Sequence, residues 1–313
     1  MSKSSSEVTL KRMETAKTIV ADDRVHRALL DEHITPEDWK KAREELNETP
    51  ETRLAALRAF KEKVTEEKDY VARTDDIYVL RFLRTRKFDL ERAVKLMRDH
   101  YKFRAKHPAI FPAPSTVEKA LKANIFNYLP HRDHKGRAIF VVKMGEWNPD
   151  EVPYHDFVAA GNLVSEYVLD NPVTQINGYI GIWDFKGFGL KQFVPFCSPK
   201  NAWLLCNLMQ DRFPARFKIA YCVNCLQLVN TTWGLFKPLL KEKFRNRVKI
   251  LSTDMKELHQ FVDPSILPIE YGGVMPPSDC QEMAQMVLDK EQYFNFNRKF
   301  GFPAKENHKV HDV

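Results

Sequence analysis

Two short clusters of side chains could bind a metal ion or carry out thiol chemistry. His131-Arg-Asp-His134 offers two imidazoles and a carboxylate, but no second group of ligands accompanies it, and Asp133-His-Lys-Gly136 has the composition of a turn. Cys222-Val-Asn-Cys225 has redox spacing, but it follows an apolar stretch and does not open a helix, where the dipole would lower a thiol pKa. The sequence therefore predicts a turn, two buried unreactive cysteines and no metal site.

The motifs of nucleotide-binding proteins and serine hydrolases are missing from the sequence. Gly187-Phe-Gly189 lacks the third glycine of a dinucleotide fingerprint, and the stretch after the first predicted strand, 143–147, holds one glycine. Neither G-x-x-x-x-G-K-[ST] nor G-x-S-x-G occurs. No acid, base and nucleophile can be assembled into one set, so these residues by themselves identify no catalytic site.

The composition is that of a folded chain from a reducing compartment. Hydrophobic residues make up 43% and charged residues 29%, and five cysteines are too few for a disulfide framework. The N-terminus has no apolar signal segment, and Ser2 stands where N-myristoylation requires glycine. The uncharged stretch 219–236 contains several amides and hydroxyls that would be costly in lipid. We therefore expect a cytosolic protein without a membrane span.

The first hundred residues predict a helical bundle. Thr35 and Thr49 each precede a proline and acidic residues, the pattern of a helix N-terminus. Further helices are expected over 76–85 and 89–106, the second ending at a His-Pro step. The helix after Thr49 should bury the apolar residues that recur at helical spacing, namely Leu54, Leu57, Phe60 and Val64.

After Pro112 the pattern changes to strands that alternate with helices. Such alternation is typical of βαβ units with a largely parallel sheet, so the predicted fold class is α/β, preceded by an all-α bundle. The tail beyond 276 is polar, with one amphipathic turn around 283–288. The expected strands are 138–142, 179–183, 217–223 and 248–251, and the expected helices are 154–169, 201–210 and 231–243.

The α/β half carries more large apolar side chains than a sheet core needs. The expected helix 201–210 is rich in Trp and Leu, and the segment 231–240 is apolar nearly all round. A helix of this kind must be covered on more than one side. Two interpretations remain open: an ordinary core, or one wall of a lipid cavity with the helix of Trp233 as its lid.

Six segments, in order, resemble the CRAL-TRIO family of lipid-transfer proteins over roughly 30–275. The chain looks closest to the branch of tocopherol transfer protein, cellular retinaldehyde-binding protein and the clavesins. The resemblance implies a helical N-terminal domain, a closed apolar cavity under a mobile helical lid, and no catalysis. The segments are Phe82-Leu-Arg-Thr-Arg-Lys-Phe88, Thr174-Gln-Ile-Asn-Gly178, Asp184-Phe-Lys-Gly-Phe188, Asp211-Arg-Phe-Pro-Ala-Arg-Phe217, Phe236-Lys-Pro-Leu-Leu240 and Leu267-Pro-Ile-Glu-Tyr-Gly-Gly273.

With the resemblance, the chain divides into four parts. We expect a polar N-terminal arm over 1–25, a helical CRAL-TRIO N-terminal domain over 26–112, a CRAL-TRIO lipid-binding domain over 113–275 and a C-terminal tail over 276–313. The lid falls on Trp233, Leu235 and Phe236.

The resemblance also places a ligand pocket. A tyrosine and a carboxylate of the retinaldehyde-binding branch are replaced here by Gly161 and Trp183, and the tocopherol branch fits these two positions better. Ser165 could hold a ligand hydroxyl or bond back to its own helix. The implied ligand is tocopherol- or retinoid-like, with no other cofactor. The pocket positions fall on Val158, Gly161, Ser165, Tyr179, Trp183, Leu205, Leu208, Met209, Phe213 and Phe217.

The net charge of +7 indicates an acidic partner. It is concentrated in two stretches: 81–104 has nine Lys or Arg against three acids, and 237–249 has six against one. Nucleic acid is not favoured, because exposed aromatic residues are not interleaved with the charges and no recognised motif occurs. The resemblance implies instead a phosphoinositide-binding cleft, whose basic residues match Arg84, Lys218, Lys243 and Arg247; the alternative is that these are merely solvated faces.

We therefore expect a monomeric cytosolic carrier of one lipophilic molecule. It would associate peripherally with endosomal or other phosphoinositide-rich membranes, where each Lys or Arg contributes about 1 kcal/mol. Two alternatives stay open: a trafficking adaptor that senses phosphoinositides without a dedicated cargo, and an α/β enzyme that acts on a lipid.

Overall fold

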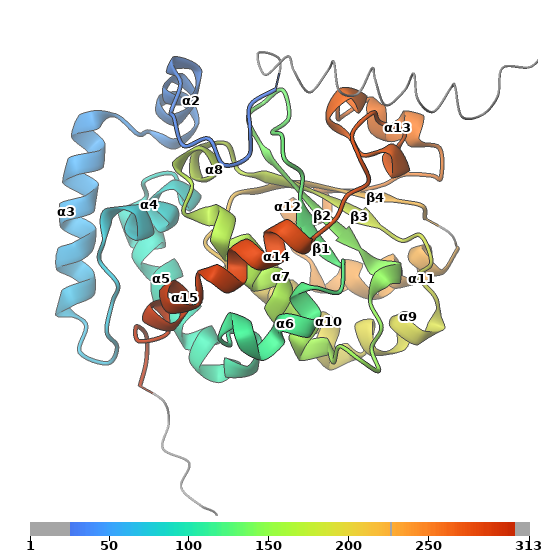
Figure 1. Cartoon of the computed structure of the whole chain (residues 1–313). Coiled ribbons are helices and arrows are strands. Elements are labelled where there is room, and N and C mark those ends of the chain that lie inside the picture. Colours follow the sequence, from blue (N-terminus) through green and yellow to red (C-terminus); the bar gives the residue numbers. More distant parts are fainter. Residues whose placement is uncertain (1–25, 226, 304–313) are drawn as a thin grey trace, which may run out of the picture.

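A five-stranded sheet forms the centre of the structure, a computed structural model that describes residues 26–225 and 227–303 (Figure 1). β1 is antiparallel to β2, and the other neighbouring strands are parallel, so the predicted α/β class is confirmed. The strands, in spatial order, are β1 (Phe126–Tyr128), β2 (Ala138–Lys143), β3 (Tyr179–Asp184), β4 (Phe217–Val223) and β5 (Val248–Ile250). Sequence patterns miss β1, because three residues are too few to show alternation.

The two faces of the sheet are buried against different partners. Side chains alternate along a strand, so Ile180 and Ile182 of β3 pack with Leu258 on one face, and Tyr179 and Trp183 enter the core on the other face. The α/β domain carries α6 (Glu118–Leu121), α7 (Tyr154–Leu169), α8 (Pro172–Asn177), α9 (Leu190–Phe196), α10 (Pro199–Asn207), α11 (Gln227–Phe236), α12 (Glu242–Arg245) and α13 (Met255–His259).

A bulge changes which side chains of β4 face the helices. The register between β3 and β4 shifts between Tyr179 and Gly181. One extra residue therefore lies in β4, and both Phe217 and Ala220 belong to the core on the helical face. Short 3₁₀ turns complete the domain at η1 (Pro108–Ile110), η2 (Pro114–Val117), η3 (Met144–Glu146), η5 (Lys237–Leu239), η6 (Pro264–Ile266) and η7 (Ile269–Tyr271).

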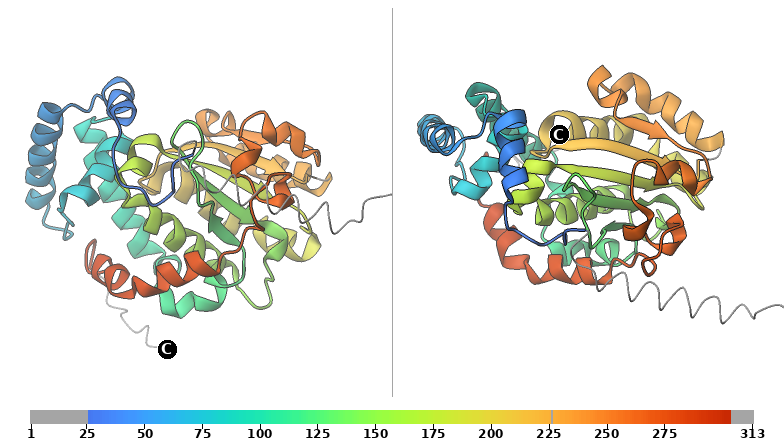
Figure 2. Two further views of the ribbon diagram at one scale, coloured as in Figure 1. Left: turned by 45° about the horizontal axis from the view of Figure 1, so that its top comes forward. Right: turned by 90° about the horizontal axis from the view of Figure 1, so that it is seen from above.

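The N-terminal helices gather on one side of the sheet domain in every view (Figure 2). Thr35 and Thr49 cap their helices with capping boxes, as their sequence signals predict. Phe60, together with Leu57 and Val64, is buried, but Leu54 is 68% exposed, so its predicted core position is wrong. The helices are α2 (Pro36–Leu46), α3 (Pro50–Glu66), α4 (Asp76–Thr85) and α5 (Leu90–Lys106).

Two predicted helices end earlier than their composition suggests. The helix expected over 231–243 breaks after Phe236 into η5, an extended Leu240 and the separate α12. Pro238 explains the break, because it lacks an N–H and disfavours helical backbone before it. The helix expected over 201–210 ends at Asn207 and continues as a π-turn, η4 (Leu208–Arg212).

The C-terminal segment is not the polar tail with one turn that composition predicts. It forms α14 (Gln281–Asp289) and α15 (Glu291–Asn297), and Met283, Val287 and Phe294 are buried in the main core. These residues are separated by helical spacing in a mostly polar sequence, so a composition average hides them. Helix α14 lies across α7 in Figure 1, and a bridge from Gly301 to Val71 reaches the N-terminal domain.

A buried ion pair within the N-terminal helices is hydrogen-bonded to the α/β domain. The Arg84 guanidinium on α4 donates to both carboxylate oxygens of Glu48, at 2.9 and 2.7 Å, and to Gln175 Oε1 on α8 at 2.9 Å. Glu48 is fully buried and Arg84 is 2% exposed. Burial removes the water that would otherwise solvate these charges, and the bidentate hydrogen bonds replace it.

We predict that Glu48→Gln destabilises the protein by about 3–5 kcal/mol, because the Arg84 charge stays buried without its counter-ion. The measurement is the free energy of unfolding in urea. Arg53→Gln is the matched control, since it removes the more exposed partner of the same carboxylate, at 2.8 Å, and should cost under about 1 kcal/mol. Equal losses in the two variants would contradict this account.

Candidate functional site

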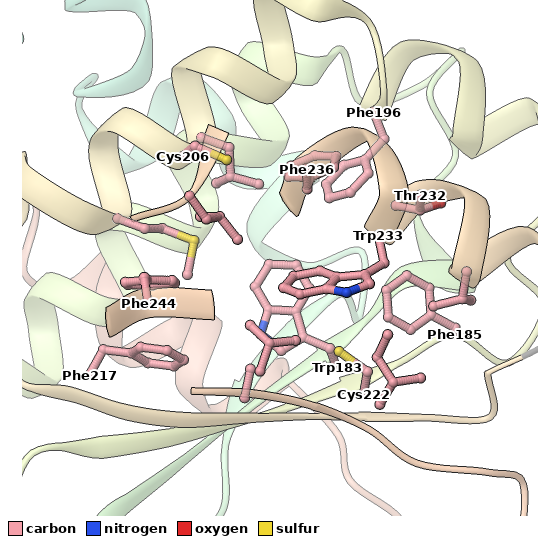
Figure 3. Close-up of a pocket in the computed structure, with 17 residues that line it drawn as sticks. Trp183, Phe185, Phe196, Cys206, Phe217, Cys222, Thr232, Trp233, Phe236 and Phe244 are labelled. Atoms are coloured by element: carbon pink, nitrogen blue, oxygen red, sulfur yellow. The ribbon is translucent and has the colours of Figure 1, made fainter. Parts of the chain in front are cut away.

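An apolar cavity of about 90 Å³ lies between the sheet and the helices α10 and α11 (Figure 3). We call it the outer compartment. The hydroxyl of Thr232 in its wall donates to Leu228 O at 3.0 Å, so it is already bonded within its own helix. The wall is formed by Trp183, Phe185, Phe196, Leu205, Cys206, Met209, Phe217, Ala220, Cys222, Val229, Thr232, Trp233, Phe236, Leu240, Phe244, Val248 and Ile250.

A second cavity of about 60 Å³, the inner compartment, lies against α7 and the start of β3. The ten side chains predicted as ligand contacts all line it: Val158, Gly161, Ser165, Tyr179, Trp183, Leu205, Leu208, Met209, Phe213 and Phe217. Their role as contacts remains a prediction. The sequence comparison missed Phe126, Phe140, Phe157, Asn162 and Gly181. Gly181 could have been found from strand alternation, since it precedes Trp183 by two residues.

Trp183 stands at the junction of the two compartments, because it lines both together with Leu205, Met209 and Phe217. Its indole lies back along β3: a Cβ added to Gly181 would be 3.0 Å from Trp183 Nε1. Gly181 therefore leaves the space that the indole occupies. Ligand pockets usually measure about 300–1,000 Å³. A large occupant would thus require movement of side chains such as Trp183, or of the helices above it.

One end of the inner compartment is polar. The Ser165 hydroxyl interacts with the buried phenol of Tyr128, and the ligand contact expected of Ser165 stays a prediction. Tyr179 lies nearby, and burial raises the pKa of both phenols well above the ordinary value. Both tyrosines are therefore neutral hydrogen-bonding groups at physiological pH. This end can receive one hydroxyl or carbonyl of an otherwise apolar molecule.

Of the three residues predicted for a lid, two face the cavity and one faces away from it. Trp233 and Phe236 of α11 face the outer compartment, where Phe236 stacks on Phe196 with ring centres 5.1 Å apart (Figure 3). Leu235 is 48% exposed on the outer side of the helix. The neighbouring elements add further exposed apolar side chains, namely Leu190, Val194, Trp203 and Leu239. We call α11 the lid helix from here on.

A groove of about 810 Å³ runs between the N-terminal helices and the α/β domain, and half of its lining residues are cationic. We call it the basic groove. Its acidic residues are Glu45 and Asp99, which pair with some of the cations, as in the 3.1 Å contact from Lys218 Nζ to Glu45. The cations are Arg86, Lys87, Arg92, Lys95, Arg212, Arg216, Lys218, Lys241, Lys243 and Arg247.

Like charges act on one another in the basic groove. Burial, and then the Arg216 guanidinium, lower the pKa of Lys218 to about 8. The pKa of Lys243 is lowered chiefly by Arg247, then by burial and by the cations Lys87, Arg92 and Arg86 of the N-terminal domain. Lysines whose charged form is disfavoured in this way gain from a bound anion. The groove therefore has the electrostatics of an anion site.

The structure corrects the set of residues predicted for this site. Lys218, Lys243 and Arg247 line the basic groove, but Arg84 does not. Its guanidinium is buried and taken up by Glu48, so it cannot reach a ligand without breaking that pair. The N-terminal domain contributes Arg86 and its neighbours instead. These residues lie in the basic stretch 81–104, so the charge count was the signal that could have found them.

The remaining chemical clusters do not form a reactive site. Burial raises the pKa of both Cys222 and Cys225, which keeps the thiols protonated. The segment 133–136 is a turn, closed by Gly136 N–H donating to Asp133 O. Within 26–225 and 227–303, no group of three or more His, Cys, Asp or Glu side chains could hold a metal ion. Over the same residues, each helix is too short or too polar to span a bilayer.

Comparison with known proteins places the chain among relatives of similar length. The CRAL/TRIO domain family matches residues 122–273, and the Pinta-like UBA domain family matches residues 49–114. Alpha-tocopherol transfer protein-like of Mus musculus is 34% identical over 267 residues, which cover 83% of this chain and 77% of the relative. Clavesin-2 of Homo sapiens is 33% identical over 282 residues, covering 87% of this chain and 86% of the relative.

Among solved structures, one titled "Crystal structure of Sfh5" superposes with a TM-score of 0.48 at 16% identity, covering 94% of this chain and 99% of that chain.

We predict that Trp183→Ala joins the two compartments. The variant should lose about 3–5 kcal/mol of unfolding free energy, because the removed indole leaves a cavity. Added dodecanol should raise its melting temperature more than that of the wild type, because an occupant of the native state stabilises it. Trp203→Ala is the control, because this tryptophan is 43% exposed, and it should lower the free energy of unfolding only slightly. An equal response to dodecanol in all three proteins would show that Trp183 does not separate the compartments.

Proposed function

The chain belongs to the CRAL/TRIO family, as its ordered sequence segments indicate, and on this premise we propose that it is a lipid carrier. It binds one lipophilic molecule in the two compartments and exchanges it at phosphoinositide-containing membranes. The single observation that supports this most directly is the apolar cavity that the lid helix closes beside a basic groove. The names of the relatives, which include a tocopherol transfer protein-like protein, agree with it.

The chemistry of the cavity favours a long apolar ligand with one polar end. The polar end would lie beside Ser165 and Tyr179 in the inner compartment, where the hydroxyls can donate or accept. The remainder would pass Trp183 into the outer compartment, whose wall is apolar. An isoprenoid alcohol or phenol has this shape, so a tocopherol- or retinoid-like lipid is the ligand class that we propose.

The outer surface of the lid region suits contact with a bilayer. Leu235 of the lid helix and Trp203 of α10 are exposed to water. Full burial of a large apolar side chain is favourable by about 1.5–3 kcal/mol, so their exposure forgoes part of that free energy. Insertion into lipid would remove that penalty. Trp233 and Phe236 line the cavity, so they would meet the membrane only if the lid helix moved.

The basic groove is the proposed site for a phosphoinositide headgroup. Lys218, Lys243 and Arg247 lie in it on the α/β side, and Arg86 and Lys87 lie on the side of the N-terminal helices. A cation close to an anionic membrane contributes about 1 kcal/mol. The groove would thereby concentrate the protein, with peripheral attachment, at membranes that carry such lipids.

One observation favours a second candidate. The groove, at about 810 Å³, is far larger than the compartments of about 90 and 60 Å³. A phosphoinositide-binding adaptor without cargo would need the groove and no cavity. The enzyme alternative gains no such support, because the polar groups of the cavity are hydroxyls and an amide without a titrating base beside them.

Binding assays decide between carrier and adaptor. We expect retinol or α-tocopherol to quench the fluorescence of Trp183 and Trp233, which line the cavity, and native mass spectrometry to show one ligand per chain. Carotenoids and sterols complete the panel. If phosphoinositide vesicles bind the protein while no member of the panel enters the cavity, the adaptor is correct and the carrier is wrong.

Membrane binding should depend on pH through Lys218. Its pKa of about 8 means that the ammonium charge is present below pH 8 and is lost as the pH rises through that value. Binding to vesicles with phosphatidylinositol bisphosphate should therefore weaken between pH 7 and 9. Lys218→Arg, which stays charged over this range, is the matched variant and should lose that dependence.

A second pair of variants tests the site itself. Lys243→Ala with Arg247→Ala should weaken binding to the same vesicles roughly tenfold or more, at about 1 kcal/mol per charge. Retinol affinity should stay within a few-fold. Lys256→Ala with Lys290→Ala, two lysines outside the groove lining, is the control. Undiminished vesicle binding by the first pair would rule out the groove as the headgroup site.

A further inference from the structure

The basic groove and the lipid cavity share one wall. Met209, Phe217 and Phe244 line the groove on one side and the outer compartment on the other. Met209 belongs to the π-turn η4, whose next residue, Gln210, lines the groove. Insertions of π geometry into helices are rare and frequently occur at functional sites. This turn is therefore placed to link the contents of the groove with those of the cavity.

The side chain of Gln210 binds the chain just beyond the lid helix. Its Oε1 accepts from the backbone N–H of Lys241 at 2.6 Å, and its Nε2 donates to Leu239 O at 3.1 Å. Nε2 also donates to Cys206 O, one turn back in its own helix, at 3.1 Å. One amide thus holds two backbone groups on either side of Leu240.

Leu240 has the position of a hinge for the lid helix. Its N–H donates to Lys237 O at 3.3 Å and closes η5, but its own backbone is extended and separates this 3₁₀ turn from helix α12. Its side chain is buried and lines the outer compartment. Rotation about an extended residue between two helical elements moves everything on one side of it, as hinge residues do. The two Gln210 hydrogen bonds span this position and restrain it.

The π-turn that contains Gln210 is itself held in place by a hydrogen bond to α5. At the end of the π-turn, Arg212 O accepts from His100 Nδ1 of α5 at 2.7 Å. Burial lowers the pKa of His100 to about 3, so the ring stays neutral and this hydrogen bond does not change at physiological pH. At the other side of the lid helix, Cys197 Sγ lies 3.8 Å from Thr232 Oγ1, which is a weak contact. The stronger restraint is therefore at Gln210.

We propose that Gln210 is a positioning residue for lipid transfer: its side chain is a latch that holds the lid closed, and the latch lies where an anion in the basic groove can release it. This rests on the proposed carrier function. A phosphate oxygen in the groove is an acceptor that can replace Gln210 Oε1 at the N–H of Lys241, and it also attracts the side chains of Lys241 and Lys243. The headgroup would thus open the lid by exchanging one hydrogen bond for another.

Gln210→Met tests the latch, because methionine keeps the length and helix preference of glutamine but makes none of its three hydrogen bonds, two of which reach the segment beyond the lid helix. Retinol is loaded into the full-length protein, and its transfer to neutral phosphatidylcholine vesicles is followed by fluorescence. We expect transfer about 5- to 100-fold faster than from the wild type, as two net hydrogen bonds would give. Gln285→Met, at an exposed glutamine that bonds Asp289, is the matched control and should transfer at the wild-type rate.

Phosphatidylinositol bisphosphate in the vesicles supplies the second arm. This lipid should strongly accelerate retinol transfer from the wild type. It should accelerate transfer from Gln210→Met much less, because the latch of that variant is already released. A variant that transfers to neutral vesicles at the wild-type rate overturns the proposal. So does a variant with full phosphoinositide acceleration. If the wild type takes up no retinol or other lipid, the carrier function has failed, which is a different result.

A structural role for Gln210 would be visible in other measurements. If the side chain merely stabilised the π-turn, Gln210→Met would lower the melting temperature and speed hydrogen exchange throughout α10. The latch predicts faster exchange at the amide of Lys241, with the amides of α10 unchanged. Gln210→Glu keeps an acceptor for that amide, so its transfer rate should lie between those of the wild type and Gln210→Met; a rate above that of Gln210→Met contradicts the latch.

Discussion

A single layer of side chains, formed by Met209, Phe217 and Phe244, separates an apolar cavity from a groove lined with cations. These two environments have opposite requirements, since one excludes water and the other holds charges that need it. The separation depends on the bulge in β4, which turns both Phe217 and Ala220 toward the cavity, and on the π-turn that follows α10. A molecule that displaces these side chains from one side therefore also changes the shape of the space on the other side.

The basic groove exists only where the two halves of the chain meet. Arg86 and Lys87 come from the N-terminal helices, and Lys243 and Arg247 come from the α/β domain. Bringing these cations together is unfavourable, as the lowered pKa of Lys243 shows. The buried pair of Arg84 and Glu48, packed against Gln175, helps to hold the halves in contact in spite of that repulsion. Arg84 thus supports the groove although it does not line it.

The cavity is closed by contacts of unequal strength. Apolar packing, such as the stacking of Phe236 on Phe196, covers the outer compartment and is not directional. The polar contacts from Gln210 are directional and few, so they determine where the lid is attached. A carrier needs both properties, because the lipid must be sealed from water in transit and released at its destination. Trp183 adds a further constraint, since its indole divides the enclosed space.

Much of this arrangement could be predicted from local sequence. The caps at Thr35 and Thr49, the buried runs of β2 to β4 and the basic stretches are each encoded within a few residues, because capping, alternation and charge act over short distances. The family segments also indicated ten residues that prove to line one cavity. Tertiary structure alone decided four other features. These are the burial of Arg84, the exposure of Leu54, the bulge in β4 and the hydrogen bonds from Gln210 to Leu239 and Lys241. Each of these depends on a partner distant in the sequence, and no local pattern specifies which partner packing will bring near.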